Sequence, residues 1–455
     1  MTRPEASRRP LSRRTFLAGT GMAAAAVAMA SCSRTSTGGK TGGASNPLAG
    51  VNGSTLSFGA CLPLSGAFTI ITKPWAAAMR YACDEVNEAG GLTIKGKKIK
   101  VEAPVIDEGY AAAPALASVQ KLLSQGGRYV GGLVSEEAPV AVLGINEQAN
   151  TLVTACINGL PAMMPNKLRF FEDALTYATG GLRAQFAYSE LGLRRMATIE
   201  LKNSWGNSYQ TTFAKAFTEL GGEIVARDYM QVTDTDFSGR ISGWKSKNPD
   251  GLYIIIGDGP GTTIAAQATQ LGFDSQPILT EGAWDPNSYA KTGKSFIDRC
   301  YYLAEYPYSH WNSDIAALAE KLYKDEKLYT TNWFWQGYDS TRMVLAAMDA
   351  ANSTDPRDVV EALPQAISNG ANKWLVQAKG AVGTKEKGVF LQTPVWMSKF
   401  KPVTTDFLSE APLEPVQQTA YQGAQGWMPE SWDGYTQAAD KVTIPSMSDL
   451  KSLVG

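Results

Sequence analysis

Leu252-Tyr253-Ile254-Ile255-Ile256 is a short apolar run followed by glycine and then by a stretch with helical spacing. A continuous apolar run of this length is typical of a strand buried on both faces of a parallel sheet. Comparable runs lie on either side of it along the chain. We therefore expect strands at 196–201, 223–232, 252–257 and 277–280, and helices at 180–191, 208–220, 236–247 and 261–271.

An earlier part of the chain repeats this alternation. Here the predicted strands are 56–62, 99–106, 129–134 and 151–156, and the predicted helices are Pro74–Ala89, 111–125 and 138–150. The first of these helices carries its apolar side chains on one face, at Trp75, Ala78, Ala82 and Val86. Repeated βα units imply parallel sheets covered by helices on both faces. Two such series predict an α/β protein with two doubly wound parallel-sheet lobes.

The N-terminal residues have the layout of an export signal. Arg13-Arg14 precede an apolar stretch that runs to Met29 without a charge, and its length of about 15 residues is too short for a membrane-spanning helix. The arginine pair resembles the signal of the pathway that exports folded bacterial proteins. Met29-Ala30-Ser31-Cys32 resembles a lipobox, which predicts acylation of Cys32. An ordinary cleaved signal with a chance cysteine is the alternative.

Composition excludes several classes of function. The net charge of −1 gives no basic face for nucleic acid. The cysteines after Cys32 show no CxxC and no metal-like spacing, so no metal is expected. Cys61 and Cys83 are the nearest pair for a disulfide, and buried apolar thiols are the alternative that we favour.

Nothing in the sequence marks an enzyme. His310 is the only histidine and has no nucleophile motif near it. The loop 257–261 is rich in glycine, but it lacks a P-loop lysine and does not fit GxGxxG. A pair of catalytic carboxylates, as in a hydrolase, stays open as the least favoured alternative. We expect no cofactor and no catalytic residues.

A series of short motifs, in order along the chain, resembles one family. They are Leu62-Pro63-Leu64-Ser65-Gly66, Asp84 to Gly91, Asp107, Gly131-Gly132, Asn203-Ser204-Trp205-Gly206, Asp236-Phe237-Ser238, Gln270 to Phe273, Thr280-Glu281-Gly282 and Gln336-Gly337-Tyr338-Asp339. The chain resembles the leucine/isoleucine/valine-binding proteins, which have the type I periplasmic binding fold. The resemblance implies an extracytoplasmic solute-binding component of an ABC importer. Its partners would be ABC permease and ATPase subunits, and a lipid anchor would hold it at the cell membrane.

The resemblance also implies how the chain divides. Two lobes are joined by a three-stranded hinge and close on a ligand. We expect a signal peptide at 1–31, a flexible tether at 32–53, lobe 1 at 54–178 plus 308–370, lobe 2 at 179–307 plus 371–401, and a C-terminal extension of unknown role at 402–455.

In lobe 1 the candidate ligand contacts follow two predicted strands. Ser135 follows the third strand, where its hydroxyl and nearby N–H groups would hold a polar group, although a plain helix N-cap is the alternative. Cys156 and Asn158 follow the fourth strand, at positions where the family offers an amide and a hydroxyl. Asn158 reads equally as a turn residue before glycine.

In lobe 2 the candidates are Trp205, Asp258 and Glu281. Trp205 lies where the family has an aromatic cleft residue, and we expect it on a loop. Asp258 follows the strand 252–257. Glu281 matches the acid that binds the ligand ammonium in amino-acid-binding relatives, with a solvated loop acid as the alternative. Trp284 and Tyr338 are weaker candidates for aromatic walls.

Glu136-Glu137 departs from the family, whose members usually have small neutral residues there. Acids at this place stabilise a helix N-terminus, and they would repel a carboxylate if they faced the ligand. A cleft that these acids faced would suit a neutral amide, a cation or another polar solute. The expected ligand is an amino acid or a related small polar solute. The alternative function is a ligand-sensing receptor on the same fold, for an amide, urea, a polyamine or an aromatic acid.

Overall fold

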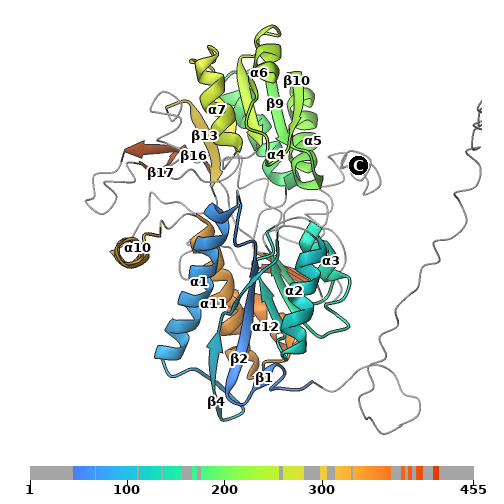
Figure 1. The fold of residues 1–455 in the computed structure, drawn as a ribbon, viewed down its shortest axis with the longest axis vertical. Coiled ribbons are helices and arrows are strands. Elements are labelled where there is room, and N and C mark those ends of the chain that lie inside the picture. Colours follow the sequence, from blue (N-terminus) through green and yellow to red (C-terminus); the bar gives the residue numbers. More distant parts are fainter. Residues whose placement is uncertain are drawn as a thin grey trace, which may run out of the picture. The chain divides into compact units, whose positions relative to one another are not determined.

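The described strands form two sheets, each covered by helices (Figure 1). We call the sheet that contains β2 and its helices the first lobe, and the sheet that contains β9 and its helices the second lobe. The computed structural model describes residues 45–66, 68–109, 112–134, 137–155, 166–171, 176–255, 260–280, 298–304, 313–328, 332–369, 381–384, 388–391, 396–402 and 413–419.

The first lobe has a mostly parallel sheet. Its strands run in the order β14-β15-β8-β7-β6-β2-β4-β3, with β1 and β5 also paired to β2. The strands are β1 (Val51–Asn52), β2 (Thr55–Leu62), β3 (Leu92–Ile94), β4 (Lys97–Glu102), β5 (Val105–Asp107), β6 (Tyr129–Gly131), β7 (Leu152–Ala155), β8 (Arg169–Phe171), β14 (Ala381–Thr384) and β15 (Gly388–Leu391). The helices are α1 (Thr69–Glu88), α2 (Ala112–Ser124), α3 (Glu137–Leu143), α10 (Ser313–Glu326), α11 (Asn332–Ala351) and α12 (Pro356–Ser368).

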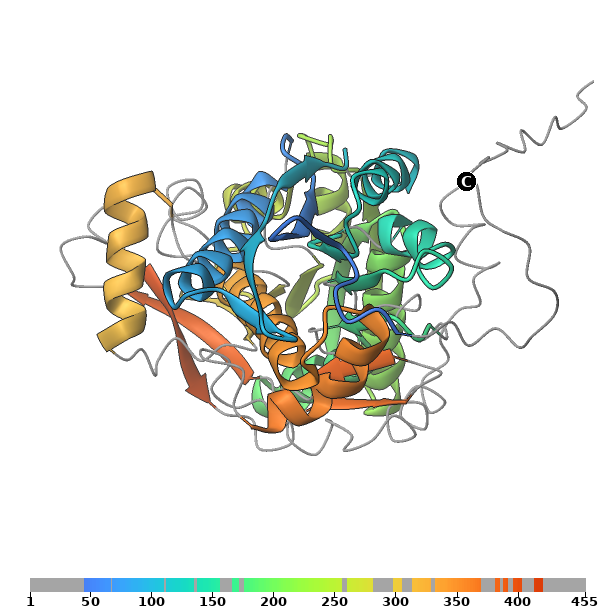
Figure 2. The ribbon, with the colours of Figure 1, turned by 90° about the horizontal axis from the view of Figure 1, so that it is seen from below.

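Side-chain alternation along β2 determines how this sheet is covered. Phe58 and its inward neighbours pack with α1, α11 and α12 in one apolar cluster. The opposite face meets α2, where a Cβ on Gly59 would lie 2.7 Å from the Leu122 side chain. Figure 2 shows α1, in blue, beside α11, which in turn lies beside α12, both in orange. Burial of both faces explains why the central strands β2, β6 and β7 are mainly apolar runs without polar alternation.

The second lobe has the strand order β10-β9-β11-β12-β13-β16-β17. Its strands are β9 (Arg195–Leu201), β10 (Glu223–Met230), β11 (Gly251–Ile255), β12 (Ile278–Thr280), β13 (Cys300–Ala304), β16 (Trp396–Pro402) and β17 (Leu413–Thr419). Its helices are α4 (Thr176–Gln185), the π-helical turn η2 (Phe186–Glu190), α5 (Ser204–Glu219), α6 (Ser238–Lys245) and α7 (Pro260–Gln270).

Alternate residues of β9 face two different apolar clusters. Ile199 packs on one face among side chains of α6 and α7, such as Trp244. Met196 packs on the other face with Phe213 and its neighbours from α5. Strands β9 to β12 pair in parallel, so helices on both faces are the arrangement expected for such a sheet.

The order in which the strands join the two sheets shows that the chain crosses between the lobes three times. The chain leaves the first sheet after Phe171, returns to the first lobe after Ala304, and leaves its sheet again after Leu391. Together with the parallel pairing, this confirms the predicted fold class of two doubly wound lobes. The connecting residues themselves lie outside the described part of the chain.

Two segments differ from the predicted division of the chain. Residues 381–391 were expected in lobe 2, but β14 and β15 belong to the first sheet, where β15 pairs in parallel with β8 through Val389 and Phe170. In the expected extension, β17 adds an antiparallel strand to β16 in the second sheet. Both placements depend on pairing between segments distant in sequence, which local patterns do not report.

Helix and strand boundaries also differ in places. Helix α1 begins at Thr69 and contains Pro74 in its interior, whereas Pro74 was expected to start the helix. The single strand predicted at 99–106 is two strands, β4 and β5, both parallel to β2. Pro104 lies between them, and it lacks the N–H that a continuous ladder needs.

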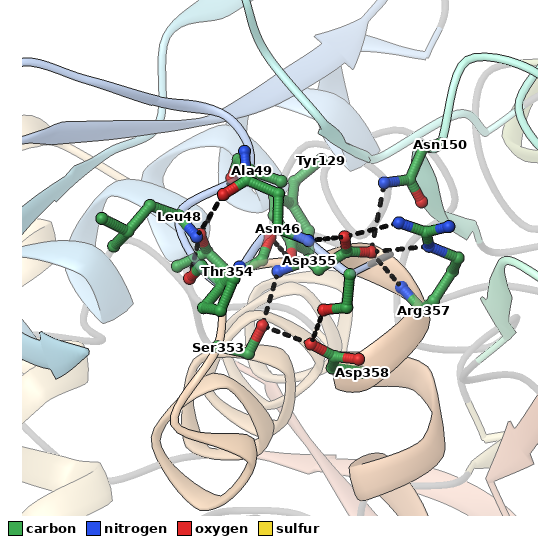
Figure 3. Close-up of polar contacts among 12 residues, drawn as sticks. Asn46, Leu48, Ala49, Tyr129, Asn150, Ser353, Thr354, Asp355, Arg357 and Asp358 are labelled. Carbon is green, nitrogen blue, oxygen red and sulfur yellow. Dashed lines mark hydrogen bonds and ion pairs between the residues drawn. The ribbon is translucent and has the colours of Figure 1, made fainter. Parts of the chain in front are cut away.

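The start of the described chain is fastened at the amino-terminal edge of the first sheet (Figure 3). Asp355 accepts hydrogen bonds from the Asn46 backbone N–H at 2.8 Å, from Asn150 Nδ2 at 3.1 Å and from Arg357 Nη2 at 2.8 Å. Thr354 donates its N–H to the Pro47 carbonyl at 2.9 Å. These contacts hold the first residues of the lobe beside the N-terminus of α12.

The environment of Asp355 favours its ionised form. Burial alone raises the pKa of Asp355, but the hydrogen bonds from Arg357, Asn46 and Asn150 outweigh it and hold the pKa well below its usual value of 3.8. A carboxylate with a lowered folded-state pKa stabilises the fold above its unfolded pKa. That stabilisation is lost as the pH falls through the folded pKa.

We expect Asp355→Ala to lower the free energy of unfolding by about 2–4 kcal/mol at neutral pH, because several charge-assisted hydrogen bonds are lost. The difference from wild type should shrink in acid, below about pH 4. Urea unfolding at a series of pH values measures both effects. Asp325→Ala is the control, because Asp325 is an exposed acid on α10. Equal losses of unfolding free energy in Asp355→Ala and Asp325→Ala would contradict the stabilising role of Asp355.

Candidate functional site

The carboxyl ends of four parallel strands meet at one edge of the first sheet. Strands β2, β5, β6 and β7 end at Leu62, Asp107, Gly131 and Ala155. The chain passes from β2 to β4 and β5 on one side and then to β6 on the other, so the strand order reverses between β2 and β6. Ligands of open parallel sheets bind outside the carboxyl ends at such a switch point. This edge is the candidate functional site of the first lobe.

A glycine allows the two central strands to approach closely at the switch point. Gly132 follows β6 with φ of +99°, a left-handed conformation that favours glycine. A Cβ at this position would lie 2.6 Å from a side-chain carbon of Leu62 at the end of β2. Gly132 of the predicted family motif Gly131-Gly132 is therefore needed here for a steric reason.

Most of the predicted contacts lie outside the described residues. In the sequence, Cys156 directly follows the last residue of β7 and Glu281 directly follows the last residue of β12. The predicted residues outside the described part are Ser135, Glu136, Cys156, Asn158, Asp258, Glu281 and Trp284, together with Cys32 of the tether.

Trp205 lies at the carboxyl end of β9, in a helix and not on a loop. Asn203 is the N-cap of α5, and its side chain accepts a hydrogen bond from the Gly206 N–H at 2.9 Å. This N-cap starts the helix directly after the strand, which the prediction of a loop overlooked. A Cβ on Gly206 would come within 2.3 Å of the Leu201 carbonyl oxygen, so only glycine allows this tight strand-to-helix turn.

The Trp205 ring is half-buried and packs against Tyr209, with ring centroids 4.8 Å apart. The indole also contacts both apolar clusters of the second lobe. It thus lies at the strand end where the family resemblance places an aromatic ligand contact.

Tyr338 is a core residue and does not line a site. The ring is fully buried in the apolar cluster of the first lobe. Its hydroxyl donates a hydrogen bond to Glu85, which also accepts one from Arg342 Nη1 at 2.6 Å. Burial and the Glu85 carboxylate raise the pKa of Tyr338 above its usual value. The interpretation of Tyr338 as an aromatic wall is therefore wrong.

Glu108 is a buried acid at the switch point that the sequence analysis did not identify. It directly follows β5, and its side chain is fully buried. Neither carboxyl oxygen has a hydrogen bond of ordinary geometry to a described group. Burial raises the pKa of Glu108 to about 8, while the Val134 backbone N–H opposes this shift. A buried and perturbed acid at a strand edge is typical of functional sites.

Glu200 connects the end of β9 to the helix that carries Trp205. It is fully buried and accepts a hydrogen bond from Arg227 Nη2 at 2.9 Å. The same guanidinium donates to Asn207 Oδ1 at 2.7 Å, in the first turns of α5. The cluster therefore joins β9, β10 and α5, and it holds the start of α5 in place.

Cys61 and Cys83 are buried and are not joined in a disulfide. Burial raises the pKa of each thiol to about 12, so both are protonated and unreactive at neutral pH. This agrees with the interpretation of these two residues as small apolar core residues. Within the described part of the chain, no helix has the length and apolar character needed to cross a membrane.

A family model described as "periplasmic binding protein" matches residues 55–401. This range includes both sheets except β1, β17 and the last residue of β16. The chain belongs to the periplasmic binding protein family. The match confirms the family suggested by the short motifs, and the two doubly wound lobes are the architecture expected of a type I periplasmic binding protein.

Curated relatives are similar to this periplasmic binding protein at low identity. The Leu/Ile/Val-binding protein homolog 6 of Brucella abortus is 24% identical over 204 residues, which are 44% of this chain and 50% of the relative. The chain thus spans about half the length of this relative. The leucine-specific-binding protein of Salmonella typhimurium is 24% identical over 327 residues, which are 68% of this chain and 84% of the relative.

Solved structures share the fold. A leucine-binding protein LivK from Thermotoga maritima has a TM-score of 0.64 and 19% identity, and the match covers 80% of this chain and 99% of that one. A fatty acid ABC transporter substrate-binding protein from Thermomonospora curvata has a TM-score of 0.67 and 17% identity, with 85% and 97% covered. At these identities the likeness supports the fold alone.

Proposed function

We propose that this periplasmic binding protein is the extracytoplasmic solute-binding component of an ABC importer. It captures an amino acid or a related small polar solute between its lobes and delivers it to a permease that an ATPase drives. The observation that carries the proposal is the family match over residues 55–401, on a chain that folds into two parallel-sheet lobes.

The candidate contacts support binding of a small polar solute. Ser135, Cys156 and Asn158 follow strands β6 and β7 of the first lobe, and Asp258 and Glu281 follow strands β11 and β12 of the second. Backbone N–H groups, hydroxyls and acids at such ends bind the charged and polar groups of ligands. Glu281 carries the preference for a solute with an amine, since a carboxylate in a closed cleft needs a cation or several donors.

The names of similar proteins keep the solute class broad. One structure is named as a leucine-binding protein, another as a fatty acid transporter component, and a third, from R. palustris, was solved with benzoate. A common fold thus serves apolar, aromatic and amino-acid ligands. The amino-acid assignment for this protein therefore rests on Glu281.

Export and anchoring complete the proposed function. Arg13-Arg14 would direct export of the folded protein, and Cys32 would carry the lipid after cleavage. The anchor leaves the protein on the extracytoplasmic face of the cell membrane, with residues 32–44 as the tether. This tether is shorter than the expected 32–53, because residues 45–52 are hydrogen-bonded to the first lobe. The fastened segment that begins at Ser45 lies at the amino-terminal edge of the first sheet. The solute edge, formed by carboxyl ends, is the opposite edge of the same sheet.

A thermal-shift screen against amino acids, amides, polyamines and aromatic acids tests solute binding, because a ligand that binds only the folded state raises Tm. We expect an amine-bearing solute to raise Tm. Calorimetry with that solute should show that Glu281→Gln weakens binding by roughly a hundredfold or more, from loss of a buried charge pair. Glu102→Gln is the control, since Glu102 is an exposed acid on β4. Unchanged affinity in Glu281→Gln would refute the role of this acid.

Cell fractionation tests the anchor separately. We expect Cys32→Ala to move the exported protein from the membrane fraction to the soluble fraction, because the acylation site is removed. Arg13→Lys together with Arg14→Lys should leave precursor in the cytoplasm. Retention of the Cys32→Ala protein on membranes would show that another segment anchors it.

A further inference from the structure

Glu108 lies where three elements of the first lobe meet. It directly follows β5, and its backbone N–H donates to the Leu62 carbonyl at the end of β2 at 3.3 Å. Its carboxyl interacts electrostatically with Cys61 of β2 and with the backbone N–H of Val134, which follows β6. Since β2 lies between β5 and β6, the Glu108 side chain reaches across the end of β2 to the switch point.

The location is costly for an acid. The side chain is fully buried, and neither of its oxygens has a hydrogen bond of ordinary geometry among the described residues. Buried polar groups of native proteins are nearly always hydrogen-bonded, and a group that is not needs an explanation. An apolar side chain would fill the same space without this cost. The carboxyl is therefore expected to serve something other than stability.

The contact with Val134 indicates that the Glu108 carboxyl acts on the turn after β6. This residue is three positions beyond the end of β6 and three before the start of α3 at Glu137. Gly132 already brings the same turn within contact of Leu62. The turn thus has one steric constraint at Gly132 and one polar contact at Val134, both directed toward the end of β2.

We propose that Glu108 is a positioning residue of the solute site, and that its carboxyl holds the start of the turn after β6, residues 132–134, against the end of β2. The proposal deepens the proposed function, since it rests on that function for the identity of the site. It assigns to Glu108 no contact with the solute. The residue acts through the backbone of the turn that leads to Ser135.

The protonation state of Glu108 makes the turn sensitive to pH. Burial raises the pKa to about 8, Asp107 adds to the rise, and the Val134 N–H opposes it. Among the described residues around the carboxyl, Asp107 and Cys61 are the titratable groups that influence it or feel its charge, and the Cys61 thiol is neutral with a pKa of about 12. The acid is thus mostly neutral at pH 7, and it ionises above about pH 8.

The direction in which pH changes the stability of the turn follows from the linkage between proton binding and folding. A carboxyl whose folded-state pKa is raised above 4.5 contributes its stability below that pH and loses it as the pH rises through about 8. As the pH rises towards that value, ionisation favours opening of the turn, since water solvates the carboxylate only when the turn is open. Between the ordinary pKa of 4.5 and the folded-state pKa of about 8, each pH unit shifts the opening equilibrium about tenfold towards the open turn, and the shift levels off above about pH 8.

Hydrogen–deuterium exchange of the full chain, without solute, measures this opening. Exchange of peptides covering 129–143 is followed at about pH 6.5 and about pH 9, with rates corrected for the intrinsic effect of pH. In wild type we expect roughly thirtyfold faster corrected exchange at the higher pH, because about 1.5 pH units separate pH 6.5 from the pKa of about 8. Glu108→Gln should retain protection at both pH values, because the amide is similar in size and cannot ionise. Glu108→Ala should lose protection at both.

Glu88→Gln and Glu88→Ala are the matched controls, since Glu88 is an exposed acid at the end of α1. Both should behave as wild type. Wild-type pH dependence that persists in Glu108→Gln would overturn the proposal. The proposal would also be overturned if Glu108→Ala lost protection equally in all peptides of the first lobe. Glu108 would then be an ordinary core residue. The measurement uses no solute, so its failure leaves solute binding standing, and a failed solute screen leaves its result valid.

Discussion

Parallel pairing of strands is the constraint on which the rest of the structure depends. In a parallel sheet every carboxyl end meets the same edge, and each crossover passes through a helix that covers one face. In the first lobe β2 and β4 to β8 pair in parallel. In the second lobe β9 to β13 do so. Residues far apart in sequence therefore collect at one edge, while the amino ends collect at the other. The turn after β6 and the N-terminus of α5 both lie at carboxyl-end edges for this reason.

The amino-terminal and carboxyl edges of the first sheet have different roles. At the amino-terminal edge, Asp355 fastens the first described residues through Asn46 and the start of α12. At the carboxyl edge, Glu108 is buried without a fixed hydrogen bond, beside a turn that glycine brings close to β2. The acid at the amino edge is stabilised as a charge, and the acid at the carboxyl edge is held neutral. Opposite environments for two acids in one lobe agree with a structural role for one edge and a binding role for the other.

Local pattern predicted most of the βα units, because buried parallel strands are apolar runs and their helices have apolar faces. The prediction failed where contacts between segments distant in sequence determine the structure. Strands β14 and β15 join the first sheet through distant pairing of β15 with β8. Tyr338 is a core residue whose hydroxyl donates a hydrogen bond to Glu85 on α1. Trp205 was placed on a loop although Asn203 is a recognisable N-cap, a signal that the sequence did contain. Glu108 was missed because burial of an acid within Asp107-Glu108-Gly109 leaves no local signature. The acids and amides expected after β6, β7, β11 and β12 stay predictions.

Solution scattering tests the central claim, that two parallel-sheet lobes close on a solute, most directly. The radius of gyration is measured for the purified chain alone and at saturation with a solute identified by thermal shift. Hinge closure of two lobes predicts a smaller radius in the saturated protein. An unchanged radius at saturation would contradict the account.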